Sequence, residues 1–567
     1  MLLFVISFFS IHYENSLFKK GDTVPVQISS LTSEKHLFPM SLNQFCDNFG
    51  TNETDFSLGA NLIGYETYKK TYDFIFNLKP QNSQNVLICS KNMTAKDINY
   101  LFNNQYRFNF RINRFKVKDE DDISGLKIIQ NRNYDSSIIN NHFSIEIHYK
   151  NTNRTSTYKI VKVTGIAESK YKTLFIQKEM NLNKFENQKI DFTFNVKFIE
   201  DQLLKDELYS TTFEQNLTFI LLLINTFCII YMVFFFCNFK NNETNLDFEE
   251  YEENSWYFVR GDIFRNPRRL PLLCSLSGIG FQLFFVGLFA SFSKYPNEAS
   301  LVNRLIFYLI LLSPLSGFIS IRMFKIADGT AWRNLISINA LLAPIIVLIS
   351  FILSQSLNFV FQSAKMLTVQ NFSIILGCIL LHIILSTIGS FFSLKIAVPQ
   401  LPFKVNLIPK QIVKQPFYLQ GIPRYLIVGF YVFLNLYSIF KIVLKMNNNI
   451  SEIIISKVFG FESLMLMFTS SFNVTLFYMF LSIKKEDYRW WWSAFLGPSF
   501  CGVFYILLAV YQYIFYEKGN IASLVIYACQ HLMIGGSFSL TAGFCGFFSC
   551  FLFLLSYYNI CFNSRLK

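Results

Sequence analysis

Residues 218–238 read TFILLLINTFCIIYMVFFFCN and contain no charged side chain. A helix needs about 20 apolar residues to cross the hydrocarbon core of a bilayer, so this stretch predicts a transmembrane helix. It also divides the chain, because the residues up to about 215 are mixed and polar, whereas the remainder is a series of long apolar runs. The sequence therefore predicts an extramembrane domain followed by a polytopic membrane domain.

The membrane part contains nine apolar segments that are each long enough to cross a bilayer. They lie near residues 218–238, 271–293, 302–321, 334–357, 371–394, 425–444, 459–483, 493–516 and 523–561. We therefore expect an all-α bundle of nine transmembrane helices. The last segment suits either one strongly tilted helix or a broken one. Four of its glycines are places to bend or to pack closely: Gly535, Gly536, Gly543 and Gly546.

The N-terminus and the distribution of basic residues predict the organisation of the chain. Residues 2–11 read LLFVISFFSI, which is too short to span a membrane and is typical of the apolar region of a signal peptide. If the N-terminal domain is luminal, most of the Lys and Arg residues between spans fall in cytosolic loops, which is the positive-inside pattern. The predicted parts are a signal peptide at 1–16, a luminal domain at 17–215, a first transmembrane helix at 216–240, a cytosolic loop at 241–270, an eight-helix transmembrane domain at 271–562 and a cytosolic tail at 563–567.

The predicted luminal domain contains two stretches in which apolar and polar residues alternate. They are FSIEIHY at 143–149 and DFTFNVKF at 191–198. A period of two residues predicts half-buried β-strands, and helical signals in this part of the chain are sparse. We expect a β-rich domain with the architecture of a β-sandwich.

Two of the eleven cysteines, Cys46 and Cys89, lie in this domain. An isolated pair in a secreted domain predicts one disulfide, and the alternative is two free buried thiols. Four sequons are possible N-glycosylation sites on a luminal surface: Asn52, Asn92, Asn153 and Asn216.

Composition narrows the classes of partner. The chain has a net charge of +13, and 52% of its residues are hydrophobic. In a soluble protein this charge would point to nucleic acid, but loops beside a membrane explain it better, so we expect membrane lipids and no nucleic acid as partners. The six histidines are scattered, and no Cys/His spacing of the zinc type occurs. We predict neither a metal site nor a cofactor.

Residues 484–492 read KKEDYRWWW, where charged residues run directly into three tryptophans. The seventh predicted span ends at this stretch and the eighth begins after it, so we expect a short cytosolic turn. Indole rings are favoured at the level of lipid headgroups, and the tryptophans therefore predict an interfacial anchor. A ligand-binding aromatic box is the alternative.

Several stretches resemble one family, the nonaspanins or transmembrane-nine superfamily. They include LICSKNMTAKDI at 87–98, WYFVRGDIFRNPR at 256–268, NLIPKQI at 406–412 and EDYRWWWSAF at 486–495. The cytosolic residues that carry the resemblance are Asp262, Phe264, Arg265, Glu486, Asp487, Trp490, Trp491 and Trp492. The resemblance implies a non-enzymatic protein of Golgi or endosomal membranes that takes part in sorting, retention or surface delivery of other membrane proteins, notably cargo with glycine-rich spans.

The chain departs from the family pattern in its seventh span and in its tail. Members usually carry a glutamate in the seventh span, where this chain has Asn473, which cannot hold a charge or exchange a proton. Glu462, about three helical turns earlier, could substitute only if it lies inside the bundle. The family tail usually ends in a coat-binding signal, Lys-x-acid, but residues 564–567 read SRLK, which weighs against vesicle coat proteins as partners.

A physical mechanism for cargo recognition follows from the bilayer. Lipid cannot satisfy polar groups or pack closely against small residues, so a host bundle can offer hydrogen bonds and close contacts to a cargo helix. The candidate cargo or packing sites are Gln282, Asn339, Asn435, Glu462 and Asn473 together with the four glycines of the last span. For each of them, contact within the protein's own bundle is the alternative.

Two other classes of function have weaker signals. A secondary transporter or channel needs ionisable residues along its path, but the predicted spans contain no Asp and only one acid, Glu462. His382 in the fifth span is expected to be a hydrogen-bonded packing residue. Intramembrane proteolysis needs a pair of catalytic side chains, and His531 and Ser537 on one helix would face different sides. We predict no catalytic site.

Overall fold

The computed structural model describes most of the chain, and the structural statements below refer to the residues that it describes. These are 17–33, 45–46, 71–76, 85–93, 97, 101, 105–112, 115–119, 125–133, 136–152, 157–169, 175–177, 188–200, 208–244, 255–292, 298–360, 369–397, 405–445, 460–517 and 521–563. The predicted signal peptide and the last four residues lie outside them.

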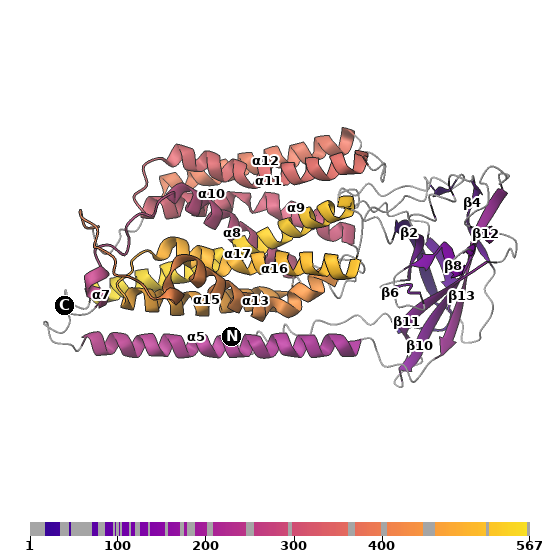
Figure 1. The fold of residues 1–567 in the computed structure, drawn as a ribbon, viewed down its shortest axis with the longest axis horizontal. Coiled ribbons are helices and arrows are strands. Elements are labelled where there is room, and N and C mark those ends of the chain that lie inside the picture. The colour runs from indigo at the N-terminus through magenta and orange to yellow at the C-terminus, as the bar shows by residue number, and fades with distance from the viewer. Residues whose placement is uncertain are drawn as a thin grey trace. The chain divides into compact units, whose positions relative to one another are not determined.

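The described residues form two compact units, of which the first ends at Phe213 and the second begins at Glu214. The first unit is built of β-strands and the second of helices (Figure 1). The predicted order, a β-rich domain followed by a helical bundle, is confirmed.

The strands of the first unit form three sheets. They are β1 (Leu17–Phe18), β2 (Thr23–Ser33), β3 (Thr71–Ile75), β4 (Val86–Met93), β5 (Tyr106–Ile112), β6 (Phe115–Lys116), β7 (Leu126–Lys127), β8 (Ile129–Asn133), β9 (Ser136–Ile139), β10 (His142–Thr152), β11 (Thr157–Glu168), β12 (Phe175–Gln177) and β13 (Gln188–Glu200). The first sheet has the order β1-β11-β10-β13-β4, the second β3-β2-β5-β6 with β7 beside β5, and the third β12-β9-β8. Strands β10 and β13 run parallel, and the other paired strands are antiparallel.

The two alternating stretches of the sequence lie in β10 and β13, which are neighbours in the first sheet. Phe143 pairs with Phe194, so the apolar faces of the two strands coincide. Phe108 of β5 packs against Phe143 with 5.0 Å between the ring centroids, and against Phe192 with 5.5 Å. Because β5 belongs to the second sheet, these rings join two sheets face to face around one core, and the predicted β-sandwich is confirmed.

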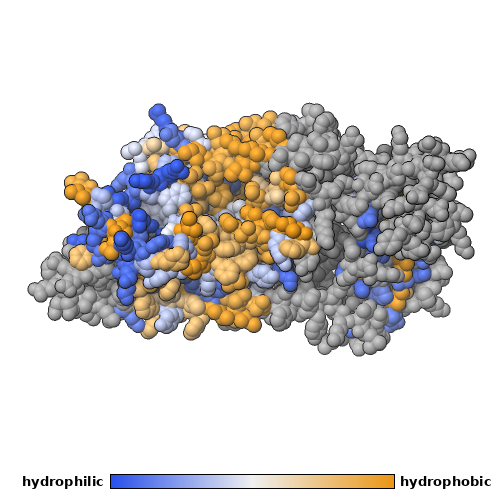
Figure 2. Space-filling view, in the orientation of Figure 1, coloured by the Kyte–Doolittle hydropathy of each residue, from blue (hydrophilic) through white to orange (hydrophobic). Residues whose placement is uncertain are grey.

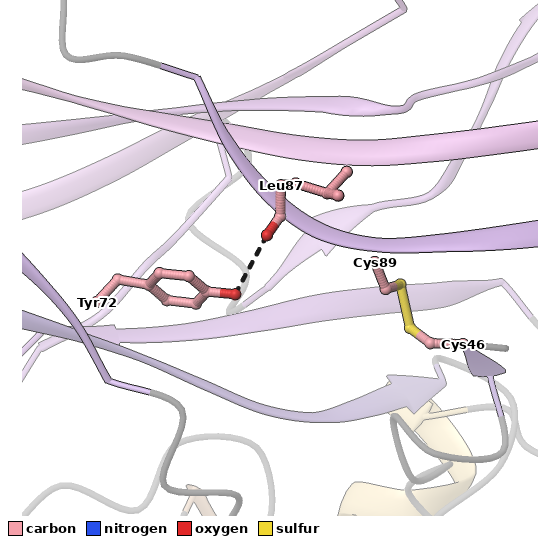
Figure 3. The surroundings of a disulfide bond; sticks show 4 residues. All are labelled: Cys46, Tyr72, Leu87 and Cys89. Atoms are coloured by element: carbon pink, nitrogen blue, oxygen red, sulfur yellow. Dashed lines mark hydrogen bonds between the residues drawn. A yellow bond between two sulfur atoms is a disulfide. The ribbon is translucent and has the colours of Figure 1, made fainter. Parts of the chain in front are cut away.

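A disulfide and a hydrogen bond secure strand β4 (Figure 3). Cys46 is bonded to Cys89 of β4 with 5.8 Å between their Cα atoms, and both residues are buried, so the predicted disulfide is confirmed. The hydroxyl group of Tyr72 in β3 donates a hydrogen bond to the carbonyl oxygen of Leu87 in β4 over 3.3 Å. This bond ties together the edge strands of two sheets. Burial raises the pKa of Tyr72 to about 12, so the hydroxyl keeps its proton at neutral pH.

We expect Cys89→Ser to destabilise the β-sandwich by about 4 kcal/mol, because the disulfide joins residues 43 positions apart in the unfolded chain. Denaturant unfolding of the full-length protein, followed by protease susceptibility of the β-sandwich, measures the loss. Cys529→Ser removes a free thiol of the helical unit and is the control. An unchanged transition in Cys89→Ser would contradict a stabilising role of the disulfide.

The second unit is built of helices. They are α5 (Leu208–Thr244), α7 (Ser255–Val259), α8 (Leu270–Ser291), α9 (Glu298–Leu311), α10 (Ser313–Ile326), α11 (Trp332–Val360), α12 (Val369–Lys395), the 3-10 helix η2 (Phe417–Leu419), α13 (Gly421–Lys445), α15 (Phe461–Lys484), α16 (Trp490–Gln512), the π-helical turn η3 (Tyr513–Glu517) and α17 (Ile521–Asn563). Each of the nine predicted spans overlaps a helix, so the predicted helical bundle is confirmed.

Eight stretches of helix within the described chain are long and apolar enough to cross a membrane. The remaining predicted span lies in α11, whose described apolar run Trp332–Ile346 is shorter. Figure 2 shows apolar side chains over the middle of the helical unit and hydrophilic side chains at the end where α7 lies. The last predicted span is one continuous helix, α17, and is not broken at its glycines.

The third predicted span is interrupted between α9 and α10. Pro314 has no N–H to donate to the carbonyl oxygen of Ile310, and the Ser313 hydroxyl donates to that oxygen instead over 2.8 Å. The carbonyl oxygen of Leu309 accepts a hydrogen bond of 2.6 Å from Nε2 of Gln282 in α8. Both carbonyls at the break are therefore satisfied inside the protein, as a hydrocarbon environment requires.

Glycines allow α10 and α12 to approach each other closely. A Cβ atom at Gly389 of α12 would collide with the carbonyl oxygen of Pro314 in α10. A Cβ atom at Gly317 of α10 would collide with the carbonyl oxygen of Ser386 in α12. The two backbones are thus in direct contact at positions where only glycine fits. By contrast, a Cβ atom at Gly377, nearer the start of α12, would meet nothing within 4 Å.

Two glycines of α12 therefore form a matched pair of test positions. Gly389→Ala is expected to destabilise the helical unit by about 1–3 kcal/mol, because the added methyl group forces the helices apart. Gly377→Ala is expected to be neutral or to stabilise by up to about 1 kcal/mol, because alanine has less conformational freedom in the unfolded chain. Thermal unfolding of both variants in one detergent measures the difference, and equal effects would argue against the close contact.

Candidate functional site

Three segments meet at the hydrophilic end of the helical unit. Residues 255–269 precede α8, residues 405–416 precede α13, and residues 485–489 join α15 to α16. We refer to these three segments together as the cap. Most of the residues that carry the family resemblance lie in it, and buried polar contacts connect its parts.

A buried carboxylate, Asp262, joins the first segment of the cap to the second. Its side chain is 0% exposed and accepts hydrogen bonds from Nε of Arg265 at 2.9 Å and from Nη2 at 2.6 Å. It also accepts from the side chain of Asn406 at 3.4 Å and from the backbone N–H of Lys410 at 3.2 Å. Nη2 of Arg265 in turn donates to the carbonyl oxygen of Asn406 over 2.6 Å. One carboxylate therefore holds a segment that contains no helix or strand of its own.

Two polar contacts join the second segment of the cap to the third. The ammonium group of Lys410 lies 2.9 Å from the carboxylate of Glu486. Nε2 of Gln415 donates to the carbonyl oxygen of Lys485 over 2.9 Å. Glu486 has a φ of 61°, a left-handed conformation that turns the chain after the end of α15.

The other acid of the third segment, Asp487, is buried. It accepts hydrogen bonds of 3.0 Å from the backbone N–H and from Nε of Arg489. The side-chain hydrogen bond to Asp487 raises the pKa of Arg489, so the guanidinium remains charged. Glu486 and Asp487 thus each hold one cation in the folded cap.

The tryptophans at the start of α16 form the base of the cap. Trp490 and Trp491 are 1% and 3% exposed and stack with 4.7 Å between their ring centroids. The prediction of a lipid-facing anchor is wrong for these two rings. Trp490 packs on Phe547 of α17 and donates through Nε1 to the carbonyl oxygen of Ile263 over 2.8 Å. The first segment of the cap thus supplies the acceptor that a buried indole needs.

The remaining aromatic residues of the resemblance also contact the bundle or the cap. Trp492 is half-buried and donates through Nε1 to the carbonyl oxygen of Arg268 over 2.8 Å. Phe264 is buried, and its ring centroid lies 6.2 Å from that of Tyr558 in α17. These contacts bind the cap to the ends of two helices, α16 and α17.

Asp262→Asn removes the charge of the central carboxylate without changing the size of the side chain. We expect segment 405–416 to detach from the cap, at a cost of about 3–5 kcal/mol, because Arg265 keeps its charge and loses its counter-charge. Limited proteolysis measures the faster cleavage of this segment. Asp328→Asn, at an exposed position after α10, is the matched control and should leave the cleavage rate unchanged. Equal rates in the two variants would show that Asp262 does not hold the segment.

Three asparagines from three helices form a hydrogen-bonded group inside the helical unit. Asn225 of α5 donates through Nδ2 to Oδ1 of Asn435 in α13 over 2.9 Å. Asn473 of α15 donates through Nδ2 to the carbonyl oxygen of Asn225 at 2.9 Å and to its Oδ1 at 3.2 Å. The sequence predicted Asn435 and Asn473 as candidates, and the structure brings them to the same partner. Asn225 was missed, although an amide within an apolar span is the signal that finds it.

The asparagine group is the deepest contact of α5. Only 6% of the residues in the most apolar stretch of this helix are buried, whereas Asn225 itself is 1% exposed. A second contact, between the rings of Phe235 and Phe480 of α15, has a centroid distance of 5.7 Å. Oδ1 of Asn473 has no hydrogen-bond partner within the described part of the chain. The group therefore docks α5 and retains one buried, unpaired acceptor.

The other polar candidates contact their own bundle. Besides its bond to α9, Nε2 of Gln282 lies 3.3 Å from Nε2 of His382 in α12. Asn339 of α11 is buried and donates to the hydroxyl group of Ser386 over 3.0 Å. Glu462 is half-buried in the first turn of α15, near the end of that helix. Gln282 and Asn339 therefore link helices of the protein's own bundle. This was the predicted alternative to cargo binding for both residues.

The four glycine candidates of α17 divide into two kinds. A Cβ atom at Gly535, Gly543 or Gly546 would lie under 3.0 Å from atoms of α16. These three glycines therefore allow α17 to pack closely on α16. A Cβ atom at Gly536 would meet nothing within 4 Å, so this position remains open.

The predicted glycosylation sites are placed only in part. Asn92 is exposed on β4, and Asn216 lies in α5. Asn52 and Asn153 lie outside the described residues. Glycosylation at all four positions stays a prediction.

The residues considered for catalysis do not meet one another. Nδ1 of His531 lies 2.6 Å from the hydroxyl group of Tyr505, and the Ser537 hydroxyl donates to the carbonyl oxygen of Ile534 over 2.7 Å. In the described ranges, no group of three or more His, Cys, Asp or Glu side chains is placed to hold a metal ion.

The β-sandwich, the bundle of apolar helices and the cap define an integral membrane protein with an extramembrane domain at its N-terminal end. The model of the family described as Endomembrane protein 70 matches residues 39–523. The chain belongs to this family, the nonaspanins or transmembrane 9 superfamily, and the resemblance seen in the sequence is confirmed. The family is non-enzymatic, in agreement with the prediction from the sequence.

Similar proteins occur in plants, fungi and animals. Transmembrane 9 superfamily member 10 of Arabidopsis thaliana is 24% identical over 96% of this chain and 94% of its own length. A transmembrane 9 superfamily protein of Schizosaccharomyces pombe is 25% identical over 91% of this chain and 87% of its own. Transmembrane 9 superfamily member 2 of Homo sapiens is 28% identical over 57% of this chain and 50% of its own. No solved structure matches the chain.

Proposed function

We propose that this protein assists the sorting, retention or surface delivery of other membrane proteins by recognising glycine-rich or polar transmembrane helices. The observation that carries the proposal is the docking of α5. A helix of which little is buried is held at its deepest point through Asn225, which binds the amides of Asn435 and Asn473. The bundle therefore has a surface that can bind a transmembrane helix through a polar side chain.

The bilayer explains why such a surface is selective. Hydrocarbon offers no hydrogen bonds, so a polar side chain in a cargo helix gains about 0.6–2 kcal/mol when it finds a partner in another helix. Oδ1 of Asn473 is unpaired but buried, so in this proposal a cargo helix reaches it by taking the place of α5. Because an amide carries no charge, this recognition needs no change of protonation.

We assign the protein to Golgi or endosomal membranes, with the β-sandwich in the lumen and the cap in the cytosol. The disulfide supports an oxidising compartment for the β-sandwich. Exposed basic residues of the cap, such as Arg268, Arg269 and Lys414, support the cytosolic side for the cap. The partners in this proposal are membrane lipids and transmembrane cargo.

The interrupted third span favours one other candidate, a secondary transporter or channel, since broken helices bind substrates and ions in many transporters. Against it, the carbonyl oxygens at this break already accept hydrogen bonds from Gln282 and Ser313. Solute or ion flux across vesicles reconstituted with the protein distinguishes the two candidates.

Cargo capture is tested with a pair of variants in the asparagine group. Asn473→Leu removes the proposed cargo acceptor, whereas Asn225→Leu frees the amide of Asn435 and leaves Asn473 bound to α5 only through the backbone carbonyl of residue 225. We expect Asn473→Leu to reduce co-purification of a reporter with a glycine-rich, polar span about fivefold, equivalent to about 1 kcal/mol. Asn225→Leu should retain or increase it.

Two controls accompany these variants. A reporter whose span is all leucine measures capture without polar recognition. Thr387→Val removes a hydroxyl that donates only to its own helix, at Ile384. An equal fall in both asparagine variants would attribute the effect to loss of α5 docking, and no fall in either would reject recognition at Asn473.

A further inference from the structure

A buried cation, Arg424, lies in the first turn of α13, beside the end of α15. Arginine is rarely buried in proteins unless it is paired, yet Arg424 is only 8% exposed. Its Nη1 donates to the hydroxyl group of Ser482 in α15 over 3.1 Å. Its Nε has no acceptor among the residues that the structure describes.

The described protein supplies no counter-charge to this guanidinium. The two acids that follow α15 are already engaged, Glu486 by Lys410 and Asp487 by Arg489. No described carboxylate lies within ion-pair distance of Arg424.

The remaining neighbours do not replace a counter-charge. The Ser482 hydroxyl is neutral, and its proton is donated to the carbonyl oxygen of Tyr478. The guanidinium carbon also lies 5.8 Å from the ring centroid of Tyr425, which offers only the weak negative face of an aromatic ring. Lys484 and Lys485, exposed at the end of α15, add positive charge to this region.

A buried charge without a partner is strongly unfavourable, because it has lost its hydration and gained no Coulomb attraction. The N-terminus of α13 carries partial positive charge and adds to the imbalance. The C-terminus of α15 carries partial negative charge but only about half of an elementary charge, so it cannot neutralise the guanidinium. Within the described residues, the guanidinium therefore lacks an anion, and a bound anion would complete the site.

The position of Arg424 indicates where that anion comes from. The candidate spans run over Gly421–Lys441 in α13 and Phe461–Lys484 in α15, so Arg424 and Ser482 lie within a turn of the ends of their spans. This is the level of the lipid headgroups. Gln420, Gly421 and Ile422, which precede Arg424 at the start of α13, are exposed.

We propose that Arg424 is the centre of a binding site for a phosphate group between α13 and α15, and that the phosphate belongs to an anionic phospholipid of the surrounding leaflet. The planar guanidinium presents Nε and its terminal nitrogens as a fork that matches two oxygens of a phosphate. Basic pockets between transmembrane helices bind lipid headgroups in the same way. Ser482 binds Nη1 of the fork, and in this proposal the lipid phosphate supplies the acceptor that the buried Nε lacks.

The proposal is tested by the thermal stability of the purified full-length protein in detergent, with and without added phosphatidylserine. Wild type should be stabilised by phosphatidylserine, and Arg424→Gln should bind it about tenfold more weakly. Lys484→Gln, which removes an exposed cation at the same end, is the matched control and should respond like wild type. Native mass spectrometry of the same samples counts the phosphatidylserine molecules that remain bound.

The lipid-free measurement separates lipid binding from a merely structural role of Arg424. Without lipid, Arg424→Gln should be as stable as wild type or more stable, because the variant removes an uncompensated charge. With phosphatidylserine, the order should reverse. Arg424→Lys retains the charge but loses the fork, and it serves as the second variant if the glutamine variant does not fold; its response to phosphatidylserine should be weaker than that of wild type.

Three results would overturn the proposal. The first is a variant Arg424→Gln that responds to phosphatidylserine as strongly as wild type does. The second is a wild type that phosphatidylserine does not stabilise. The third is an equal, Arg424-dependent stabilisation by inorganic phosphate alone, which would assign the site to a free anion instead of a lipid.

Discussion

Hydrocarbon offers no hydrogen bonds, and the arrangement of the helical unit depends on this constraint. Each buried amide must find its partner on another helix or on a freed carbonyl group. Asn225 meets Asn473 and so ties α5 to the bundle. Gln282 meets the carbonyl of Leu309, so the chain can be interrupted by a proline within a span without leaving that oxygen unpaired. Polar side chains therefore select which of many similar apolar helices become neighbours, a choice that apolar contacts alone make poorly.

The need to pair buried polar groups also explains the structure of the cap, to which Arg424 is an exception. Asp262 and Asp487 are buried acids, and each is matched by an arginine of its own segment. Glu486 is matched by a lysine from another segment. These pairs fix the connecting segments of the cap, and Trp490 and Trp492 beneath them receive their acceptors from one of these segments. No described acid pairs with Arg424, and the proposed lipid phosphate would complete the site.

Most of the fold could be predicted from the sequence, because its signals are local. An apolar run long enough to cross a bilayer predicts a helix whatever lies beside it, and the alternation in β10 and β13 predicts strands whose apolar faces meet a core. The candidate sites could be predicted only as residue types. Gln282, Asn339 and three glycines of α17 were rightly singled out as unusual in a membrane, but whether they bind cargo or their own neighbours depends on distances that no local pattern contains.

By itself, the sequence determined the two-part organisation, the strands of the sandwich, the apolar helices and the family, because length, periodicity and motif are properties of short stretches. Only the tertiary structure decided that Trp490 is buried under a loop 227 residues away, that Asn225 joins Asn473 across 248 residues, and that Nε of Arg424 is buried without an acceptor among the described residues. Each of these outcomes is set by contacts between distant residues. The free-energy contribution of an indole, an amide or a guanidinium depends on the groups that surround it, because burial and hydrogen bonding determine that contribution.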